Sequence, residues 1–308
     1  MAIETVKFKF NGDTYTLTLG ADGKYTAKIP APTASSFHLE GGYYPGEVEV
    51  KDNAGNTTVV GVSHSTLGDK LKVFVQEKNK PVITIISPSS GSYVTTSKPT
   101  FKFKVVDNTV QTEGYSGVKK DSVVLTVGGV KVNSSLITWE DTDGGYIGTY
   151  TPSADLANGD CTVSVSASDN DGNAADIVNV TFEIDTLAPE LIVDSPVDGT
   201  ATNESQVTVS GKTDNDATIK IFLNDRDQGS ATVNTDGIFS KVINLTEQGA
   251  NDIKIVAKDP AGLETIKRKT IIFNTTAPDV LDVIIEPNPV DGGTTFTITV
   301  EAVALGGV

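Results

Sequence analysis

The chain of 308 residues contains one cysteine, one tryptophan and two histidines, His38 and His64. A single cysteine cannot form an intramolecular disulfide, and two histidines cannot build a histidine-rich metal site without carboxylates. No apolar run approaches the roughly 18 residues that a membrane-spanning helix needs. The sequence therefore excludes a disulfide scaffold and a thiolate zinc site, and we expect no membrane insertion.

Basic residues are also scarce, with 24 lysines and arginines against 40 acidic residues and a net charge of −16. This excess of negative charge repels phosphate backbones, so we expect no nucleic-acid partner. Residues 2–9 alternate between polar and apolar and lack the basic and apolar regions of a secretory signal. We expect synthesis in the cytoplasm of a bacterial host; export with a signal encoded upstream is the alternative.

The sequence lacks the common catalytic motifs. It has no Gly-x-Ser-x-Gly elbow, no complete phosphate-binding loop and no His-Glu-x-x-His pair. Two carboxylates could still meet across a cleft, as in glycoside hydrolases, and sequence alone leaves that open. We expect a protein that is not an enzyme, with no catalytic residue and no cofactor.

What the sequence has in abundance is the chemistry of strands and turns. The sequence is rich in the β-branched residues Val, Ile and Thr, contains 8 Tyr and 11 Phe, and has 29 glycines and 13 prolines between its apolar stretches. β-Branched and aromatic residues favour pleated strands, and Gly and Pro favour the turns between them. The composition therefore predicts an all-β fold.

One short pattern recurs three times, in residues 47–56, 163–173 and 253–263. In each copy an alternating strand ends in an aspartate (Asp52, Asp169 or Asp259), and a glycine follows three residues later. Aspartate accepts hydrogen bonds from nearby backbone N–H groups, and glycine tolerates the positive φ of a tight turn. The copies lie roughly 100 residues apart, which is the size of a β-sandwich domain.

Three prolines mark the places where one module passes to the next. Pro81, Pro189 and Pro278 each precede an apolar strand, where the missing N–H costs no ladder hydrogen bond. Linkers this short, with hardly any Gly/Ser tract, predict a semi-rigid bead string. We expect a first module at 1–79, a second with a long insertion at 80–186, a third at 187–275, and a C-terminal segment at 276–308 that is a partial module or a hairpin anchor.

These motifs support a resemblance to a known group of proteins. The Asp-x-x-Ala-Pro and Ser-Pro-x-x-Gly motifs, the segments 233–240 and 245–251, and the Asp-x-Ala-Gly turn are similar to tandem bacterial immunoglobulin-like domains. The resemblance is greatest to multi-domain proteins encoded by prophages and phage tail modules of Gram-positive bacteria, and to adhesin stalks. It implies tandem β-sandwich modules, and it marks a fold and not an activity.

The turn at Asp169, Asp171 and Asn173 has the spacing with which a calcium-binding EF-hand loop begins. The rest of that loop is missing, because Gly172 stands at the fourth position and Val180 at the twelfth, where glutamate is required. We therefore favour a plain turn, keep these three residues as candidate calcium ligands, and expect that no metal is required for folding.

Aromatic residues give the candidates for interaction sites. Trp139 precedes the turn at 141–145, and Tyr43 and Tyr44 follow a glycine pair. A rigid aromatic ring could stack on a sugar or a protein partner, although a half-buried structural role is the interpretation we favour for all three.

The C-terminal segment predicts two strands, at 280–286 and 295–301, which are too few to close a sandwich. Its apolar face, including Phe296, Ile298 and Val300, must be covered. Either the chain is cut inside a fourth module or a partner completes the segment by strand addition. We favour the partner, which would make this segment an assembly anchor.

The functional expectation follows from the resemblance together with the missing catalytic motifs. We expect a structural or interaction protein of a phage or phage-like tail, such as a baseplate, fibre or adhesion component of the virion. Its partners would be other tail proteins in multiple symmetric copies, and a host-surface glycan. The alternative is a bacterial cell-surface adhesin or carbohydrate-binding stalk.

Overall fold

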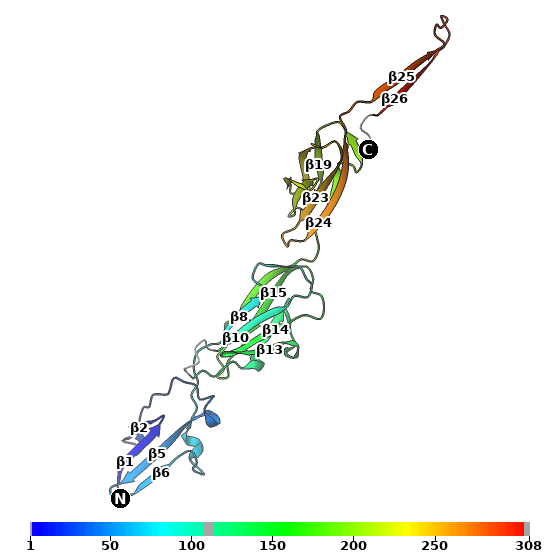
Figure 1. Ribbon diagram of the computed structural model, residues 1–308. Helices are drawn as coiled ribbons and strands as arrows, with labels where there is room; N and C mark the ends of the chain where they lie inside the picture. Colours follow the sequence, from blue (N-terminus) through cyan, green and yellow to red (C-terminus); the bar gives the residue numbers. More distant parts are fainter. Residues whose placement is uncertain (1, 108–113, 305–308) are drawn as a thin grey trace. The chain divides into compact units, whose positions relative to one another are not determined.

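A computed structural model describes residues 2–107 and 114–304. The expected insertion in the second module begins at 108–113, and the C-terminal segment ends at 305–308; both stretches lie outside the described residues. The described chain is almost entirely β-structure, as predicted, and its cores are those of tandem β-sandwich modules (Figure 1). Its helices are four short 3-10 turns, and none could cross a membrane.

The chain forms two compact units, residues 1–184 and 185–308. Within the described ranges, no hydrogen-bonded sheet crosses 74–81, 185–190 or 274–278. The strands therefore fall into four groups. The expected boundaries at 79/80, 186/187 and 275/276 lie in these strand-free stretches, but the first two strand groups share one unit.

The first module is built around one main sheet with the order β2-β1-β5-β6, and β7 also pairs with β5. Its buried apolar residues are Val6, Phe10 and Val75, fewer than a two-sheet sandwich would hold. The closed sandwich that we expect at 1–79 therefore stays a prediction. Its elements are β1 (Ile3–Phe10), β2 (Asp13–Thr16), β5 (Tyr44–Asp52), β6 (Thr57–Val60), β7 (Lys72–Val73), the hairpin β3 (Thr18–Leu19) and β4 (Tyr25–Thr26), and the 3-10 turns η1 (Glu40–Gly42) and η2 (Gly68–Leu71).

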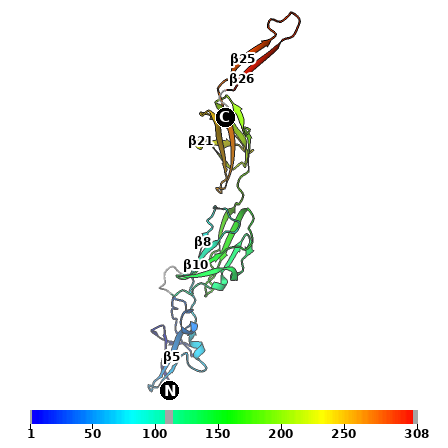
Figure 2. The same cartoon turned by 45° about the vertical axis from the view of Figure 1, so that its right-hand side comes forward.

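The second module is a two-sheet sandwich (Figures 1 and 2). Alternation in β10 and β15 buries one face of each strand, so that Phe103 and Val165 are at most 1% exposed. One sheet has the order β13 (Thr138–Thr142), β14 (Gly145–Tyr150), β10 (Phe101–Val106), β8 (Val82–Ser87). The other has the order β12 (Val130–Lys131), β11 (Val124–Val127), β15 (Gly159–Ser166), β16 (Val178–Ile184), β9 (Tyr93–Val94), and the 3-10 turns are η3 (Lys120–Ser122) and η4 (Ser134–Leu136).

The single cysteine, Cys161, is free and belongs to the core of this module. Alternation along β15 predicts an inward side chain, and the residue is 7% exposed. Burial raises the pKa of its thiol, which is the behaviour of an inert structural cysteine.

In the third module one continuous path of eight strands encloses the core. The connection is made by β21, which pairs with β20 through Arg226 and Ala231 and with β22 through Thr232 and Val233. The order is β17 (Leu191–Ser195), β19 (Gln206–Thr213), β22 (Ile238–Asn244), β21 (Arg226–Val233), β20 (Thr218–Leu223), β23 (Gly249–Lys258), β24 (Glu264–Phe273), β18 (Thr200–Thr202).

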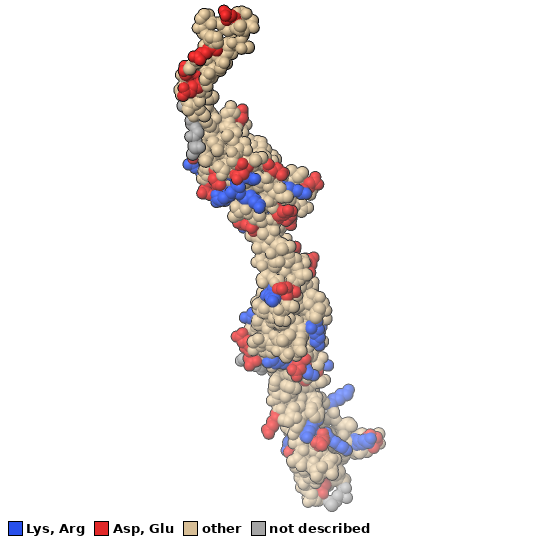
Figure 3. Space-filling view, turned by 90° about the vertical axis from the view of Figure 1, so that its right-hand side faces the viewer, with Lys and Arg blue, Asp and Glu red and all other residues tan. Residues whose placement is uncertain are grey.

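The C-terminal segment forms an antiparallel hairpin of β25 (Asp279–Glu286) and β26 (Thr297–Val303). Both strands lie within two residues of the predicted positions. Every residue of the two strands is exposed, including Ile298 at 57% and Val300 at 52%, and Phe296 just before β26 is 54% exposed. The described segment carries acidic side chains and no basic ones, whereas both signs occur together on the visible face of the preceding modules (Figure 3).

Candidate metal centre

The recurring aspartate turn has the same hydrogen bonds in all three modules. The backbone N–H of Asp52, Asp169 and Asp259 donates to the carbonyl four residues later, at 3.0–3.1 Å. The aspartate carboxylate accepts the N–H of that same later residue at 2.7–2.9 Å. The glycine between them has φ of 87°, 95° or 92°, which no other residue adopts without strain. The sequence pattern thus predicts this turn correctly, because its chemistry is local.

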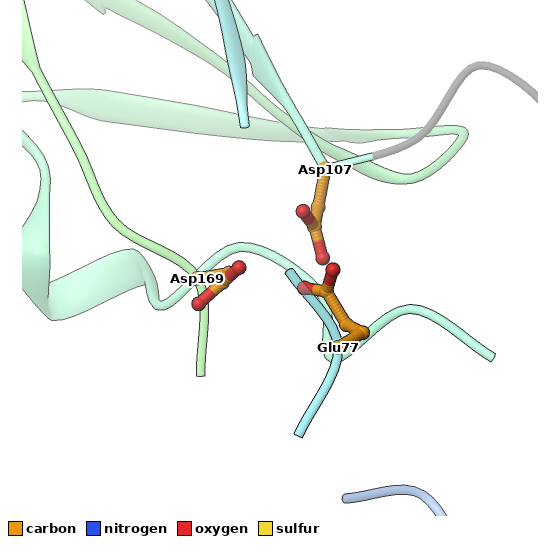
Figure 4. Close-up of side chains that lie close together, drawn as sticks. All are labelled: Glu77, Asp107 and Asp169. Atoms are coloured by element: carbon orange, nitrogen blue, oxygen red, sulfur yellow. The ribbon is translucent and has the colours of Figure 1, made fainter. Parts of the chain in front are cut away.

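In the described part of the chain, this turn meets two further carboxylates in the second module alone. One oxygen from each of Glu77, Asp107 and Asp169 lies within 4.8 Å of the other two. The exposed fractions of these residues are 4%, 3% and 0%. Figure 4 shows the carboxylates of Glu77 and Asp107 directed toward each other, with that of Asp169 beside them. This is the one such group of acidic, histidine or cysteine side chains found within 2–107 and 114–304.

Three separate segments bring these carboxylates together. Asp107 directly follows β10, and its Oδ2 accepts the N–H of Gly117 at 2.6 Å. Glu77 lies in the strand-free stretch between β7 and β8, and its backbone N–H donates to Asp171 Oδ2 at 2.9 Å. Asp169 follows β15, so the linker between two modules is held against the end of the second sandwich.

Asn173 braces the linker against the turn. Its Nδ2 donates to Asp169 Oδ2 at 2.7 Å, to the carbonyl oxygen of Glu77 at 3.1 Å and to Glu77 Oε1 at 3.2 Å. The carboxylate of Asp171 likewise accepts a hydrogen bond from the backbone N–H of Glu77. Of the three ligands that the sequence suggested, the structure places Asp169 in the cluster and gives Asp171 and Asn173 positioning contacts around it.

One oxygen of the cluster has no hydrogen-bond partner. Asp107 Oδ1 is buried and accepts no hydrogen bond among the described residues, although its carboxylate needs several donors when charged. No lysine, arginine or histidine of the described chain forms an ion pair with any of the three carboxylates. The group therefore has excess acceptors, and no positive side chain of the described residues forms an ion pair with it.

Burial sets the electrostatics of the cluster. It raises the pKa of Glu77 to about 7, and a hydrogen bond shared with Asp169 and the negative charge of Asp107 act in the same direction. Burial also raises the pKa of Asp107 to about 6, against the N–H of Gly117, which lowers it. Without a cation the folded chain thus disfavours charge on these two groups. A divalent cation supplies the opposite charge that would stabilise their ionised forms.

The arrangement fits an oxygen-coordinated cation. Calcium binds six to eight oxygen ligands at about 2.3–2.6 Å, so two ligands of one ion can be up to about 5 Å apart. The observed limit of 4.8 Å lies within that range. Zinc prefers nitrogen and sulfur ligands, which this cluster does not contain.

Sequence reasoning missed Glu77 and Asp107. One sequence signal could have pointed to Asp107, because a carboxylate directly follows a strand predicted to be buried. In the structure the end of that strand, β10, faces the Asp169 turn. Glu77 carries no such local signal, because its role depends on where the linker runs. Both residues meet Asp169 through tertiary structure, across 62 and more positions of the sequence.

The other candidate residues do not meet in one place. Trp139 lies half-buried against the second core, edge-on to Phe103 at 5.7 Å, with Lys120 Nζ 5.4 Å from its ring centre. The Tyr44 ring packs on Phe10, and its hydroxyl donates to the carbonyl oxygen of Ala34 at 3.2 Å.

Tyr43 lies edge-on to Phe74 and under Lys72 Nζ, and together with Tyr44 it lines an open cavity of about 1200 Å³ on the first module. Phe296, Ile298 and Val300 belong to the exposed hairpin. An interaction role stays a prediction for all six candidates, which are Trp139, Tyr43, Tyr44, Phe296, Ile298 and Val300.

Comparison with known proteins identifies similar stretches. A family model described as glucodextranase, domain B, matches residues 189–275, the third module. The chain is 34% identical to Bacillopeptidase F of Bacillus subtilis (strain 168) over 137 residues, which are 44% of this chain and 9% of that protein.

Solved structures of similar fold include fibronectin(III)-like modules of Clostridium thermocellum CbhA, at 15% identity and a TM-score of 0.39, covering 63% of this chain and 94% of that one. A structure of a 1.5-MDa bacterial ice-binding adhesin has 18% identity and a TM-score of 0.33, covering 88% and 86%. The strand orders and the two cores described above show by themselves that the chain contains β-sandwich modules in tandem.

Proposed function

We propose that this chain is a non-enzymatic adhesion segment whose modules hold binding surfaces in series on a bacterial cell surface. The observation that carries the proposal is that most of its buried apolar side chains belong to two closed sandwich cores, one in each unit. Such modules act through the loops and faces that they present. The similarity to a small part of a much longer protein, Bacillopeptidase F, fits a segment that works as part of a larger chain.

The binding surface would use the aromatic residues that remain accessible. Tyr43, Tyr44 and Phe74 surround the open cavity of the first module or lie beside it, and Phe74 is 67% exposed. Flat aromatic faces stack on sugar rings and on protein partners. A surface glycan is the partner that we propose for this face, with avidity over repeated copies adding to a modest single-site affinity.

Antibodies against residues 191–273 test the location. We expect them to label intact cells of the organism that makes the protein, because an adhesion segment must face outward. The control is an antibody against a cytosolic enzyme of the same cells, which must not label them. Label confined to broken cells would contradict a surface role.

A component of a phage or phage-like tail is the second candidate. The observation that favours it is the hairpin β25–β26, whose strands are exposed on both faces and have free edges. Strand addition by another tail protein would cover these edges and the apolar side chains of Ile298 and Val300. Labelling of purified particles by the same antibodies would decide for this candidate.

Deleting residues 279–308 tests the hairpin as an anchor. We expect the first three modules to stay folded, because no sheet joins them to the hairpin, and incorporation into the parent assembly to be lost. Circular dichroism measures the first effect and co-purification with the assembly measures the second. Full incorporation of the shortened chain would show that the hairpin is not the anchor.

A further inference from the structure

We propose that Glu77, Asp107 and Asp169 bind one calcium ion, and that this ion fastens the linker between the first and second modules to the end of the second sandwich. The proposal does not depend on which partner the modules meet. It starts from an imbalance of charge: three buried carboxylates lie together, and no positive side chain of the described residues forms an ion pair with them. Burying an unpaired carboxylate is costly, so a site of this kind requires either protons or a cation.

The unpartnered oxygen of Asp107 is the second observation behind the proposal. Asp107 Oδ1 is buried and accepts no hydrogen bond among the described residues. In Figure 4 the Asp107 carboxylate is directed at that of Glu77, with the Asp169 carboxylate beside them. A cation held between the three groups would contact all three residues and satisfy Asp107 Oδ1.

The donor set selects calcium among the common cations. All three ligands are carboxylates, which suit hard cations. Magnesium demands near-ideal octahedral geometry and gives up its water reluctantly. Three ligands from three separate segments form an irregular site, which the flexible coordination of calcium accepts, with water supplying the remaining ligands.

One residue of the cluster also lines a cavity. The described lining of this cavity, of about 410 Å³, is His38, Asp107, Gly114, Tyr115, Gly117, Asp143 and Gly144. Asp107 therefore belongs both to the buried cluster and to the wall of this cavity.

Calcium would act on the junction inside the first unit. Glu77 lies between β7 of the first module and β8 of the second, while Asp107 and Asp169 belong to the second sandwich. The linker is already held there by hydrogen bonds from Glu77 N–H to Asp171 and from Asn173 to Glu77. Adding an ion that bridges the same segments would reduce the freedom of residues 74–79.

Calorimetric titration of the full chain, after treatment with chelator, tests the proposal. We expect one calcium bound per chain, with magnesium binding at least about 10-fold more weakly. Asp107→Asn removes one charged ligand at nearly constant shape and should weaken calcium binding at least about 10-fold. Glu77→Gln, in the linker, should do the same and serves if the first variant does not fold.

The matched control is Asp259→Asn. Asp259 occupies the same turn in the third module and also has a buried oxygen without a partner, but it has no second and third carboxylate beside it. Its replacement should leave calcium binding unchanged. Hydrogen exchange provides a second readout. Calcium should slow exchange at residues 74–79 of the wild-type and Asp259→Asn chains, but not of the Asp107→Asn or Glu77→Gln chains.

Three results would overturn the proposal. The first is a folded wild-type chain that takes up no calcium, and the second is magnesium binding as tight as calcium binding. The third is calcium binding that Asp259→Asn weakens as much as Asp107→Asn and Glu77→Gln do.

Discussion

Replacing Phe182 by alanine is expected to lower the free energy of unfolding of the second module by about 3–5 kcal/mol. Phe182 is 1% exposed in the core between the two sheets, and its ring lies 5.9 Å from that of Phe101. The loss combines the transfer free energy of the ring with the cavity that it leaves. Thermal or urea unfolding, followed through the single tryptophan of this module, measures the effect.

Phe296→Ala is the matched control for this core substitution. Phe296 is 54% exposed, next to the hairpin, so its truncation removes little buried contact. We expect a change within about 0.5 kcal/mol, as for an ordinary surface position. Equal losses in the two variants would show that the second core is not closed as described.

Replacing Gly211 by alanine is expected to destabilise the third module by about 1–3 kcal/mol. A Cβ at this position would lie 2.0 Å from the carbonyl oxygen of Ile192 and 2.9 Å from the Phe239 ring. The backbone of β17 and a buried ring would both have to move. The measurement is the unfolding transition of the third module, compared between the variant and the wild-type chain.

Gly292→Ala is the control for this close approach. Gly292 has an ordinary φ, and no atom lies within 4 Å of the position where its Cβ would be. Its replacement should leave stability unchanged or raise it slightly, because alanine lowers the entropy of the unfolded chain. A loss at Gly211 no larger than that at Gly292 would contradict the tight pairing of β17 and β19.

The parts of the fold that the sequence predicts are those with local causes. Alternation places Cys161 and its neighbours in β15 inward, and the Asp-to-Gly spacing gives the same turn after three strands. The prolines before β8, β17 and β25 lie in strand-free stretches or at their ends. Each of these features is decided within about ten residues, so no knowledge of distant contacts is needed.

The candidate site shows where such reasoning stops. Asp169 is recognisable because its turn is local, but the same turn at Asp52 and Asp259 gathers no such cluster in the described structure. What distinguishes Asp169 is that Asp107, at the end of a strand of the other sheet, and Glu77, in the linker, both lie next to it. That meeting depends on sheet packing and on the path of residues 74–81, which no periodicity in the sequence reports.

The first module shows a second limit. Its strands have the expected alternation, yet few side chains are buried beneath the sheet. Part of its interior is polar: Ser36 and Val75 exchange three hydrogen bonds at 2.9–3.2 Å. Strand pattern alone therefore predicts the sheet but not how completely a second layer closes over it.

Differential scanning calorimetry of the full chain, with chelator and then with calcium, tests the central claim that separately closed modules carry one calcium site in the first unit. We predict separate transitions, with Phe182→Ala lowering only that of the second module and Gly211→Ala only that of the third. Calcium should raise the transition of the second module and leave that of the third unchanged. A single transition that both substitutions lower and calcium does not move would contradict the account.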